Sequence, residues 1–369
     1  MIPLFKPSVT DAEIEAVTRV LKSGWWGLGP EVEKFEQEFA DYVGVQHAVA
    51  VNSATSALEL AARACGIVNG AVVVPALTFI STAQAMQHAG NTVIFADIDS
   101  DDLCINWSDV NQKLAPVLAR PEIYGPAAVV PVWYAGAVLE PCDWAGDPWP
   151  AVPVIEDCAH AAGSRDAGKI GWAACWSFQA VKNLATGDGG MVTTDDPEVA
   201  AKVRAMRWCG IDKSTWERDQ NKYGWDYNIP ADGEKMHMND ITAALGRVQL
   251  SRLDAMNQRR RDIACEYSDA FREIDGWLSV PMYSQYESQH LFVVRVDERN
   301  RFIDHMLANG VSAGVHYKPL THYPHLFPGT HYVPVTEEVW KTLVTIPLYP
   351  DMTEAEVEQV ISTVRSFPA

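Results

Sequence analysis

Basic residues are scarce in this chain of 369 residues. It has 29 Lys and Arg against 48 Asp and Glu, which leaves a formal net charge of −19 at pH 7. A protein that binds nucleic acid needs a basic surface to neutralise phosphates, so we expect no nucleic-acid partner. A small anionic ligand is still compatible with this charge, because backbone N–H groups and one or two lysines can make a locally positive pocket.

Paired cysteines and long apolar runs are missing as well. The seven cysteines are scattered and include no C-x-x-C pair, so neither a disulfide framework nor a zinc site is predicted. No run of about 18 apolar residues occurs, so we expect no membrane span. Residues 1–7 lack the basic and then apolar pattern of a signal peptide. The expected location is therefore the cytoplasm.

Four histidines near the C-terminus raise the alternative of a metal site: His316, His322, His325 and His331. The stretch that holds them contains neither Asp nor Glu and is crowded with proline and aromatic residues. Such spacing patterns give frequent false matches to metal motifs. We therefore predict no metal site there.

The length and the hydrophobic pattern predict a large α/β domain in the first part of the chain. Short apolar runs predict buried strands at residues 71–74, 92–96, 127–132, 152–155, 174–178 and 191–193. Helical patterns lie between several of them, at residues 55–64 and 82–88. This alternation predicts a mostly parallel sheet with helices on both faces, and such sheets bind ligands at the carboxyl ends of their strands.

The pattern changes after residue 240. A long helix is predicted at residues 239–274, a strand at 290–296 and further helices at 301–309 and 353–367. We therefore predict two domains: a large α/β domain at residues 1–240 and a smaller α+β domain at residues 241–369, joined by the long helix. Residues 141–150, with prolines and a glycine, are predicted to form a loop.

The most informative residues are Lys182 and Asp157. Lys182 follows a short apolar strand, and Asp157 ends the strand before it, 25 positions earlier in the sequence. A lysine amine forms a Schiff base with the aldehyde of pyridoxal 5′-phosphate (PLP), and an acid keeps the pyridine nitrogen protonated so that the ring withdraws electrons. The pair therefore predicts a PLP site at the edge of the sheet.

Polar and aromatic residues at other strand ends support that prediction. Thr55 and Ser56 open a helix directly after the strand-like residues 48–51, and a helix start binds phosphate through its free N–H groups. Ser177 adds a hydroxyl just before the lysine, and Phe79 can stack on a flat ring. Each residue alone is more often a cap or a core residue, but together and in this order they favour a cofactor site.

The chain resembles the DegT/StrS family of sugar aminotransferases, which have the fold of aspartate aminotransferase (PLP fold type I). The similarity covers nearly the whole chain. The segments that carry it are residues 23–24, 29–36, 53–58, 78–79, 156–161, 177–190, 237–246, 314–320 and 346–348. The resemblance implies a PLP-dependent aminotransferase. Such an enzyme passes an amino group from an amino acid, expected to be L-glutamate, to a keto-sugar of a nucleotide-diphosphate sugar.

The resemblance also implies catalytic roles. Lys182 looks like the Schiff-base lysine that shuttles the proton between substrate and cofactor, and Asp157 looks like the partner of the pyridine nitrogen. Phe79 and Ala159 are expected to sandwich the ring. His160 stands where the family often has Gln or His, near the phenolic oxygen of the cofactor.

Further positions are expected to bind the phosphate or the substrate. Ala54, Thr55, Ser56 and Ser177 correspond to the phosphate cradle, although Ala54 stands where the family commonly has glycine. His316, Tyr317 and Trp25 are the expected substrate contacts.

Family members are homodimers whose sites are completed by the neighbouring subunit. The expected phosphate ligand from that subunit is Lys235, and Asn228 is the alternative. Two other functions stay open. A dehydratase or lyase on the same scaffold would eliminate water and need no amino donor, although dehydratases of the family replace the lysine with His. A regulatory member without catalysis would lack a bound cofactor.

Overall fold

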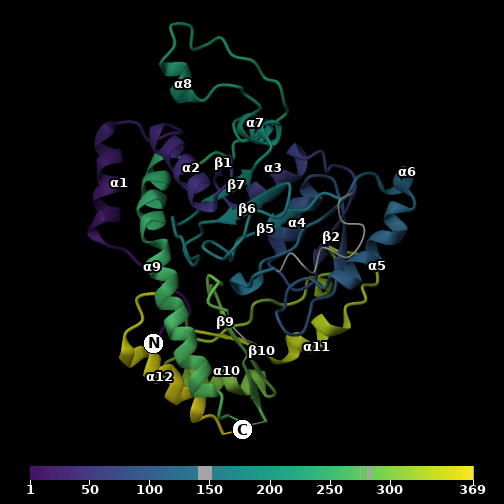
Figure 1. Ribbon diagram of the computed structural model, residues 1–369, viewed down its shortest axis with the longest axis vertical. Coiled ribbons are helices and arrows are strands. Elements are labelled where there is room, and N and C mark those ends of the chain that lie inside the picture. The colour runs from purple at the N-terminus through teal and green to yellow at the C-terminus, as the bar shows by residue number, and fades with distance from the viewer. Residues whose placement is uncertain (140–151, 275, 281–283, 369) are drawn as a thin grey trace.

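The computed structural model describes residues 1–139, 152–274, 276–280 and 284–368 (Figure 1). The loop predicted at residues 141–150 lies outside the described residues. The strands are β1 (His47–Val51), β2 (Ala71–Pro75), β3 (Thr92–Ala96), β4 (Ala127–Val129), β5 (Ile155–Asp157), β6 (Ala173–Ser177), β7 (Gly190–Thr194), β8 (Leu278–Ser279), β9 (Phe292–Val296) and β10 (Leu343–Ile346). The helices are α1 (Asp11–Ser23), α2 (Pro30–Val43), α3 (Ala54–Ala64), α4 (Ile80–His88), α5 (Trp107–Leu118), α6 (Pro121–Tyr124), α7 (Pro197–Met206), α8 (Thr215–Asp219), α9 (Asp240–Phe271), α10 (Arg299–Ala308), α11 (Pro334–Thr342) and α12 (Glu354–Arg365).

The central layer of the large part is one continuous sheet. Strands pair in the order β1-β7-β6-β5 and in the order β3-β2-β4. Parallel bridges from Val129 to Val154 and from Val132 to Asp157 join the two groups. Strand β7 runs antiparallel to both of its neighbours, while the other pairings are parallel. The predicted mostly parallel sheet is present, and the strand predicted at 152–155 is found slightly later, at β5, so that Asp157 is its last residue.

Both faces of this sheet are buried, which explains why its strands are continuous apolar runs. Along β1, Ala48 and Ala50 point into one hydrophobic core, whereas Val49 and Val51 point into the other. Helix α2 packs on the first face and α3 on the second. Helix α3 begins where Ser53 accepts a hydrogen bond from the Ser56 N–H (3.1 Å). The helix start is therefore held at the carboxyl end of β1.

Helix α9 runs from beside α1 and α2 down to the end of the molecule that holds α10 and α12 (Figure 1). Its first half packs against α1 and α2, and its second half lies beside a smaller part that contains the antiparallel sheet β10-β9-β8 with α10 and α12. The chain start also belongs there, because Ile2 pairs with Val311. The division into domains at residues 240 and 241 stays a prediction.

Candidate functional site

A cavity of about 410 Å³ opens at the carboxyl ends of β5 and β6 and beside the start of α3. It brings together most of the residues that the sequence predicted for the site: Ala54, Thr55, Phe79, Asp157, Ala159, His160, Ser177, Lys182, His316 and Tyr317. A larger hollow of about 720 Å³ lies beside the second half of α9, and neither Lys182 nor Asp157 lines it. The chemistry is therefore expected in the smaller cavity.

Lys182 projects from the connection between β6 and β7. This connection turns back on itself, with the Lys182 N–H donating to the Gln179 carbonyl (2.8 Å) and the Phe178 N–H donating to the Gly189 carbonyl (2.9 Å). Desolvation of the amine lowers its pKa from 10.5 to about 8, although the charge of Asp157 acts in the opposite direction. Near neutral pH, a much larger fraction of this amine than of an ordinary lysine is thus neutral, as a nucleophile and a proton acceptor must be.

Asp157 is buried below the cavity at the end of β5. Its Oδ2 accepts a hydrogen bond from the Thr82 hydroxyl (2.8 Å), and its Oδ1 accepts one from the Ala159 N–H (3.1 Å). Burial raises the pKa of this carboxyl, while the two donors and the charge of Lys182 oppose that shift. The contact with Thr82 was not predicted, because Thr82 belongs to α4 and lies 75 positions away from Asp157 in the sequence.

The neighbouring residue, Glu156, anchors this strand end from the opposite side. Its carboxylate accepts hydrogen bonds from the N–H groups of Gly168, Ile170 and Gly171 and from Nε1 of Trp133, at 2.8–3.1 Å. Burial raises the pKa of Glu156, and these four donors act against that shift. The side chain thereby ties β5 to the loop before β6 and holds Asp157 in place.

Replacing Glu156 with Gln is expected to lower the free energy of unfolding by about 2–3 kcal/mol, because the amide NH₂ would face N–H donors. Urea unfolding of the cofactor-free variant measures this loss. The matched control is Glu338→Gln, which removes only a surface pair with Lys341 and is expected to leave the urea midpoint close to that of the parent. Equal midpoints for E156Q and the parent would show that Glu156 is protonated in the fold.

His160 is buried and its orientation is defined on both sides of the ring. Nδ1 accepts a hydrogen bond from the Ala135 N–H (3.2 Å), and Nε2 lies 3.0 Å from the Tyr317 hydroxyl. Burial and the charge of Lys182 lower the pKa of His160 well below its usual range. The ring is therefore neutral, with its hydrogen on Nε2, where it can donate to an oxygen.

Two cavity neighbours were not predicted from the sequence. The Phe5 ring lies in the cavity wall and stacks on His290, with ring centroids 5.7 Å apart. His290 in turn lies 3.5 Å from Nζ of Lys182. The sequence placed His290 at the start of a strand and assigned Phe5 no role, since only the folded chain brings these segments to Lys182.

The start of α3 forms an anion cradle at the cavity wall. Within the described residues, the N–H groups of Ala54 and Thr55 have no hydrogen-bond acceptor, as expected for the first turn of a helix. Gly190 packs directly against this turn: a Cβ at this position would lie 2.5 Å from the Ser53 carbonyl carbon. Ser56 differs from the prediction, because its hydroxyl donates to Asn52 (2.6 Å) and does not line the cavity.

Trp25, Lys235 and Asn228 do not line the Lys182 cavity of their own chain. The Trp25 ring packs edge-on against Trp216, with centroids 4.9 Å apart. Lys235 places Nζ 5.6 Å from the centre of the Trp208 ring. Trp216 belongs to α8, which projects from the top of the molecule (Figure 1), whereas Lys235 pairs with Trp208 shortly after α7. A role for these residues in catalysis would require the cavity of a second subunit.

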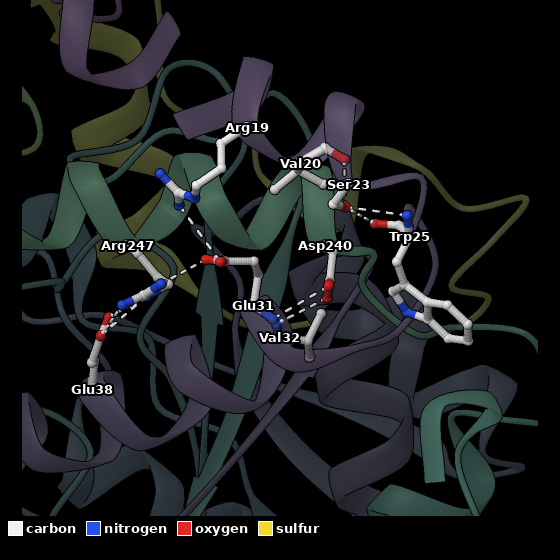
Figure 2. A network of polar contacts seen from close by, with 9 residues as sticks. All are labelled: Arg19, Val20, Ser23, Trp25, Glu31, Val32, Glu38, Asp240 and Arg247. Atoms are coloured by element: carbon white, nitrogen blue, oxygen red, sulfur yellow. Dashed lines mark hydrogen bonds and ion pairs between the residues drawn. The ribbon is translucent and has the colours of Figure 1, made fainter. Parts of the chain in front are cut away.

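A polar network fixes the segment that carries Trp25 (Figure 2). Asp240 at the start of α9 accepts hydrogen bonds from the N–H groups of Glu31 and Val32 in the first turn of α2, at 3.3 and 3.1 Å. Arg247, two turns further along α9, pairs with Glu31 and Glu38. The network thus clamps the start of α2 to α9 and holds the preceding turn.

Two further features were sought in the described part of the chain: a cluster of metal-ligating side chains and a helix that could span a membrane. This part of the chain contains no group of three or more His, Cys, Asp or Glu side chains placed to hold a metal ion. Of the four histidines considered above, His322 instead pairs with Glu337 (2.8 Å). Among the helices that the structure describes, none combines the length and the apolar character needed to cross a membrane.

Residues 7–365 match the model of the DegT/DnrJ/EryC1/StrS aminotransferase family. The chain belongs to this family. A relative, the spore coat polysaccharide biosynthesis protein SpsC of Bacillus subtilis (strain 168), is 39% identical over 389 residues, which cover 99% of this chain and 97% of SpsC.

Solved structures of similar proteins have the same fold. The sugar aminotransferase Spr1654 from Streptococcus pneumoniae, in its pyridoxamine phosphate (PMP) form, superposes with a TM-score of 0.88 at 28% identity. The match covers 100% of this chain and 99% of that one. Spr1654 was also solved in a PLP form, with a TM-score of 0.87. The sugar aminotransferase CalS13 from Micromonospora echinospora gives a TM-score of 0.86 at 26% identity, over 99% of this chain and 100% of CalS13. The predicted family, fold class and enzyme class are therefore confirmed, and the predicted cofactor is the one in the PLP form of Spr1654.

Proposed function

We propose that this aminotransferase uses PLP to move an amino group from L-glutamate to the keto group of a nucleotide-diphosphate sugar. The observation that carries the proposal is the cavity itself, where the partly neutral amine of Lys182 and the buried carboxyl of Asp157 lie together at one edge of the sheet. The sugar as acceptor is supported by the family and by relatives such as CalS13.

The residues of the cavity fit PLP by their chemistry. The unpaired N–H groups of Ala54 and Thr55 at the positive end of α3 suit a phosphate, and Ser177 adds a hydroxyl. Phe79 and Ala159 line the cavity where a flat ring can lie between them. When bound, PLP supplies an aldehyde that takes up an amine and a ring that withdraws electrons from the reacting carbon.

The protein residues then bind, orient and move protons. The carboxyl of Asp157, which is held by hydrogen bonds from Thr82 and Ala159, would keep the ring nitrogen of bound PLP protonated. Nζ of Lys182 would shuttle a proton between the substrate carbon and the cofactor. A pKa of about 8 is well suited to this role, because the amine can both accept and release a proton near neutral pH. His160 directs its Nε2 hydrogen toward Tyr317 in the cavity wall, and it would donate a hydrogen bond to the phenolic oxygen of bound PLP.

We also propose a homodimer with shared sites. The segment between α7 and α9, which includes α8, carries exposed apolar side chains: Trp225 is 76%, Ile229 64% and Tyr223 60% exposed. Such a group of side chains on one extended segment is typical of an interaction surface. A second copy seated there would bring Lys235 to the neighbouring cavity as a phosphate ligand, a role that Asn228 fills less readily because its amide already pairs with Asp212.

Domain organisation and location complete the proposal. The cavity is lined both by residues before α9 and by His316 and Tyr317 after it, which fits a site between domains at residues 1–240 and 241–369. The six described cysteines are free thiols, as in proteins of a reducing compartment, and we assign the protein to the cytoplasm.

The purified holoenzyme tests the proposed reaction. Addition of L-glutamate is expected to remove the visible absorption band of the lysine-bound cofactor and to release one 2-oxoglutarate per site. A nucleotide-linked keto-sugar should then restore the band and yield the amino sugar, detected by its mass. Loss of water from the sugar without 2-oxoglutarate would assign the protein to the dehydratases instead. Failure to bind PLP would make it a regulatory member.

The shared site predicts complementation between two inactive variants. Lys182→Ala removes the catalytic amine, and Lys235→Ala removes the ligand that the other subunit donates. Refolding them together at equal amounts is expected to restore about a quarter of the parent activity, because half of the dimers are hybrids with one intact site. The same experiment with Asn228→Ala distinguishes the two candidates. If neither mixture gains activity over its separate components, the site is not shared through this segment.

A further inference from the structure

His290 is a buried histidine that touches the catalytic lysine from outside the predicted site. It precedes β9, and its Nε2 lies 3.5 Å from Nζ of Lys182. The side chain is only 2% exposed. This distance is long for a hydrogen bond, and a small rotation of the flexible lysine side chain is enough to shorten it.

The hydrogen bonds of Asn183 define which ring nitrogen of His290 carries a hydrogen. The Asn183 amide nitrogen donates to the Ser288 carbonyl (2.7 Å), which can only accept, and to Oδ1 of Asn257 (2.8 Å). Oδ1 of Asn183 therefore faces Nδ1 of His290, 3.0 Å away, as an acceptor. Nδ1 must carry the hydrogen, so in the neutral ring the lone pair lies on Nε2 and faces Lys182.

The backbone and a neighbouring ring hold the imidazole in this position. The His290 N–H donates to the Ala135 carbonyl (2.9 Å), and the N–H of the same Ala135 donates to His160. Both Ala135 and Gln289 have left-handed backbone angles, with φ of 56° and 51°, and such angles are tolerated only where the surrounding structure demands them. Phe5 covers the outer face of the His290 ring at an interplanar angle of 9°.

We propose that Nε2 of His290 accepts a hydrogen bond from the Lys182 amine and thereby positions Nζ for proton transfer whenever the lysine is free of the cofactor. The inference rests on the proposed role of Lys182. His290 acts as a positioning residue: the proton taken from the substrate carbon stays on Nζ, and the imidazole remains neutral throughout.

The electrostatic surroundings agree with a neutral acceptor. Burial and the charge of Lys182 lower the pKa of His290 well below its usual range, with smaller contributions from His160, Arg260 and His316. Lys182 itself faces Asp157 on β5 as the opposing charge. An acceptor stabilises the ammonium form more than the neutral amine, so removing it should lower the pKa of Lys182 below about 8.

Two variants of similar size separate this role from packing. His290→Asn keeps a donor for Asn183 but places no acceptor near Lys182. His290→Gln loses that donor but can place its carbonyl oxygen near the position of Nε2. Apart from residue 290, the groups that surround Lys182 are the same in both variants. A difference in the pKa of Lys182 between the two variants therefore reports on the acceptor.

The pKa of Lys182 is measured in the cofactor-free protein, from the pH dependence of its acetylation by acetic anhydride, read by peptide mass spectrometry. In H290N the midpoint is expected to fall by about one pH unit, and in H290Q it should stay near that of the parent. In the holoenzyme, amino transfer should fall about 10- to 100-fold in H290N and recover in part in H290Q. Because the labelling needs no turnover, it tests the inference even if the proposed reaction is wrong.

An unchanged midpoint in H290N would overturn the proposal, as would equal shifts in both variants, which would indicate a role in packing alone. Should H290N fail to fold, Asn183→Ser serves instead. It leaves His290 in place but removes the acceptor that keeps the hydrogen on Nδ1, so the hydrogen can move to Nε2 and face the lysine. The midpoint is then expected to shift in the same direction, and no shift would contradict the proposal.

Discussion

Replacing Lys182 with alanine is expected to abolish amino transfer, with a loss of about 10⁴-fold or more, because the amine both carries the cofactor and moves the proton. The fold should persist. Desolvation of the amine in the parent is unfavourable and lowers the pKa of Lys182, so removal of the amine costs little folding free energy. Initial rates with L-glutamate and a nucleotide-linked keto-sugar measure the loss, and the thermal midpoint checks the fold.

The matched control for this variant is Lys169→Ala, which removes an exposed lysine outside the cavity lining. It should transfer amino groups at the parent rate. Turnover in K182A within tenfold of the parent would show that Lys182 is not the catalytic amine and would remove the basis of the proposed function.

Replacing Asp157 with Asn is expected to lower the rate about 10²- to 10⁴-fold while leaving the cofactor-free fold as stable as the parent or more stable. Burial raises the pKa of Asp157, so keeping the group ionised at neutral pH costs folding free energy, and the amide avoids that cost. The Asn oxygen can still accept a hydrogen bond from Thr82, and the loss of the single bond from the Ala159 N–H offsets only part of this gain, in contrast to Glu156, which faces four donors. Rates and thermal midpoints of the two proteins test both halves of the prediction.

The control here is Asp188→Asn, which removes a negative charge from an exposed position on the same cavity wall. Its effect on the rate is expected to be less than about tenfold, since exposed charges are screened by solvent. Similar losses in D157N and D188N would mean that the overall charge of the cavity matters and not the specific position below the ring.

Lys182 and Asp157 were predictable because Asp157 ends one apolar strand and Lys182 lies in the connection that follows the next, and strand ends meet at one edge of a parallel sheet. Their polar neighbours were not. His290 is 108 positions from Lys182 in the sequence, and a histidine before a strand is as compatible with packing as with catalysis. Only the hydrogen bonds of Asn183 reveal which nitrogen of His290 faces the amine.

Other parts of the site depend on packing that no local pattern records. The antiparallel direction of β7 was not foreseen, because an apolar strand buried on both faces reads the same in either direction. The chain start pairs with Val311 far along the sequence, and this places Phe5 in the cavity wall. Trp25 and Lys235 were assigned to the site by resemblance, and in the single chain both lie away from it.

The close approach of Gly190 to Ser53 limits which residues near the cavity can be exchanged, both in evolution and by protein engineering. Any side chain at Gly190 would meet backbone atoms that cannot yield, since they belong to the first turn of α3. Position 190, next to the anion cradle at the start of α3, is therefore expected to tolerate only glycine. Phe5 and Val181 line the cavity with side chains rather than with packed backbone. New substrate ranges should arise by exchange of such side chains, with the inherited chemistry beneath them left intact.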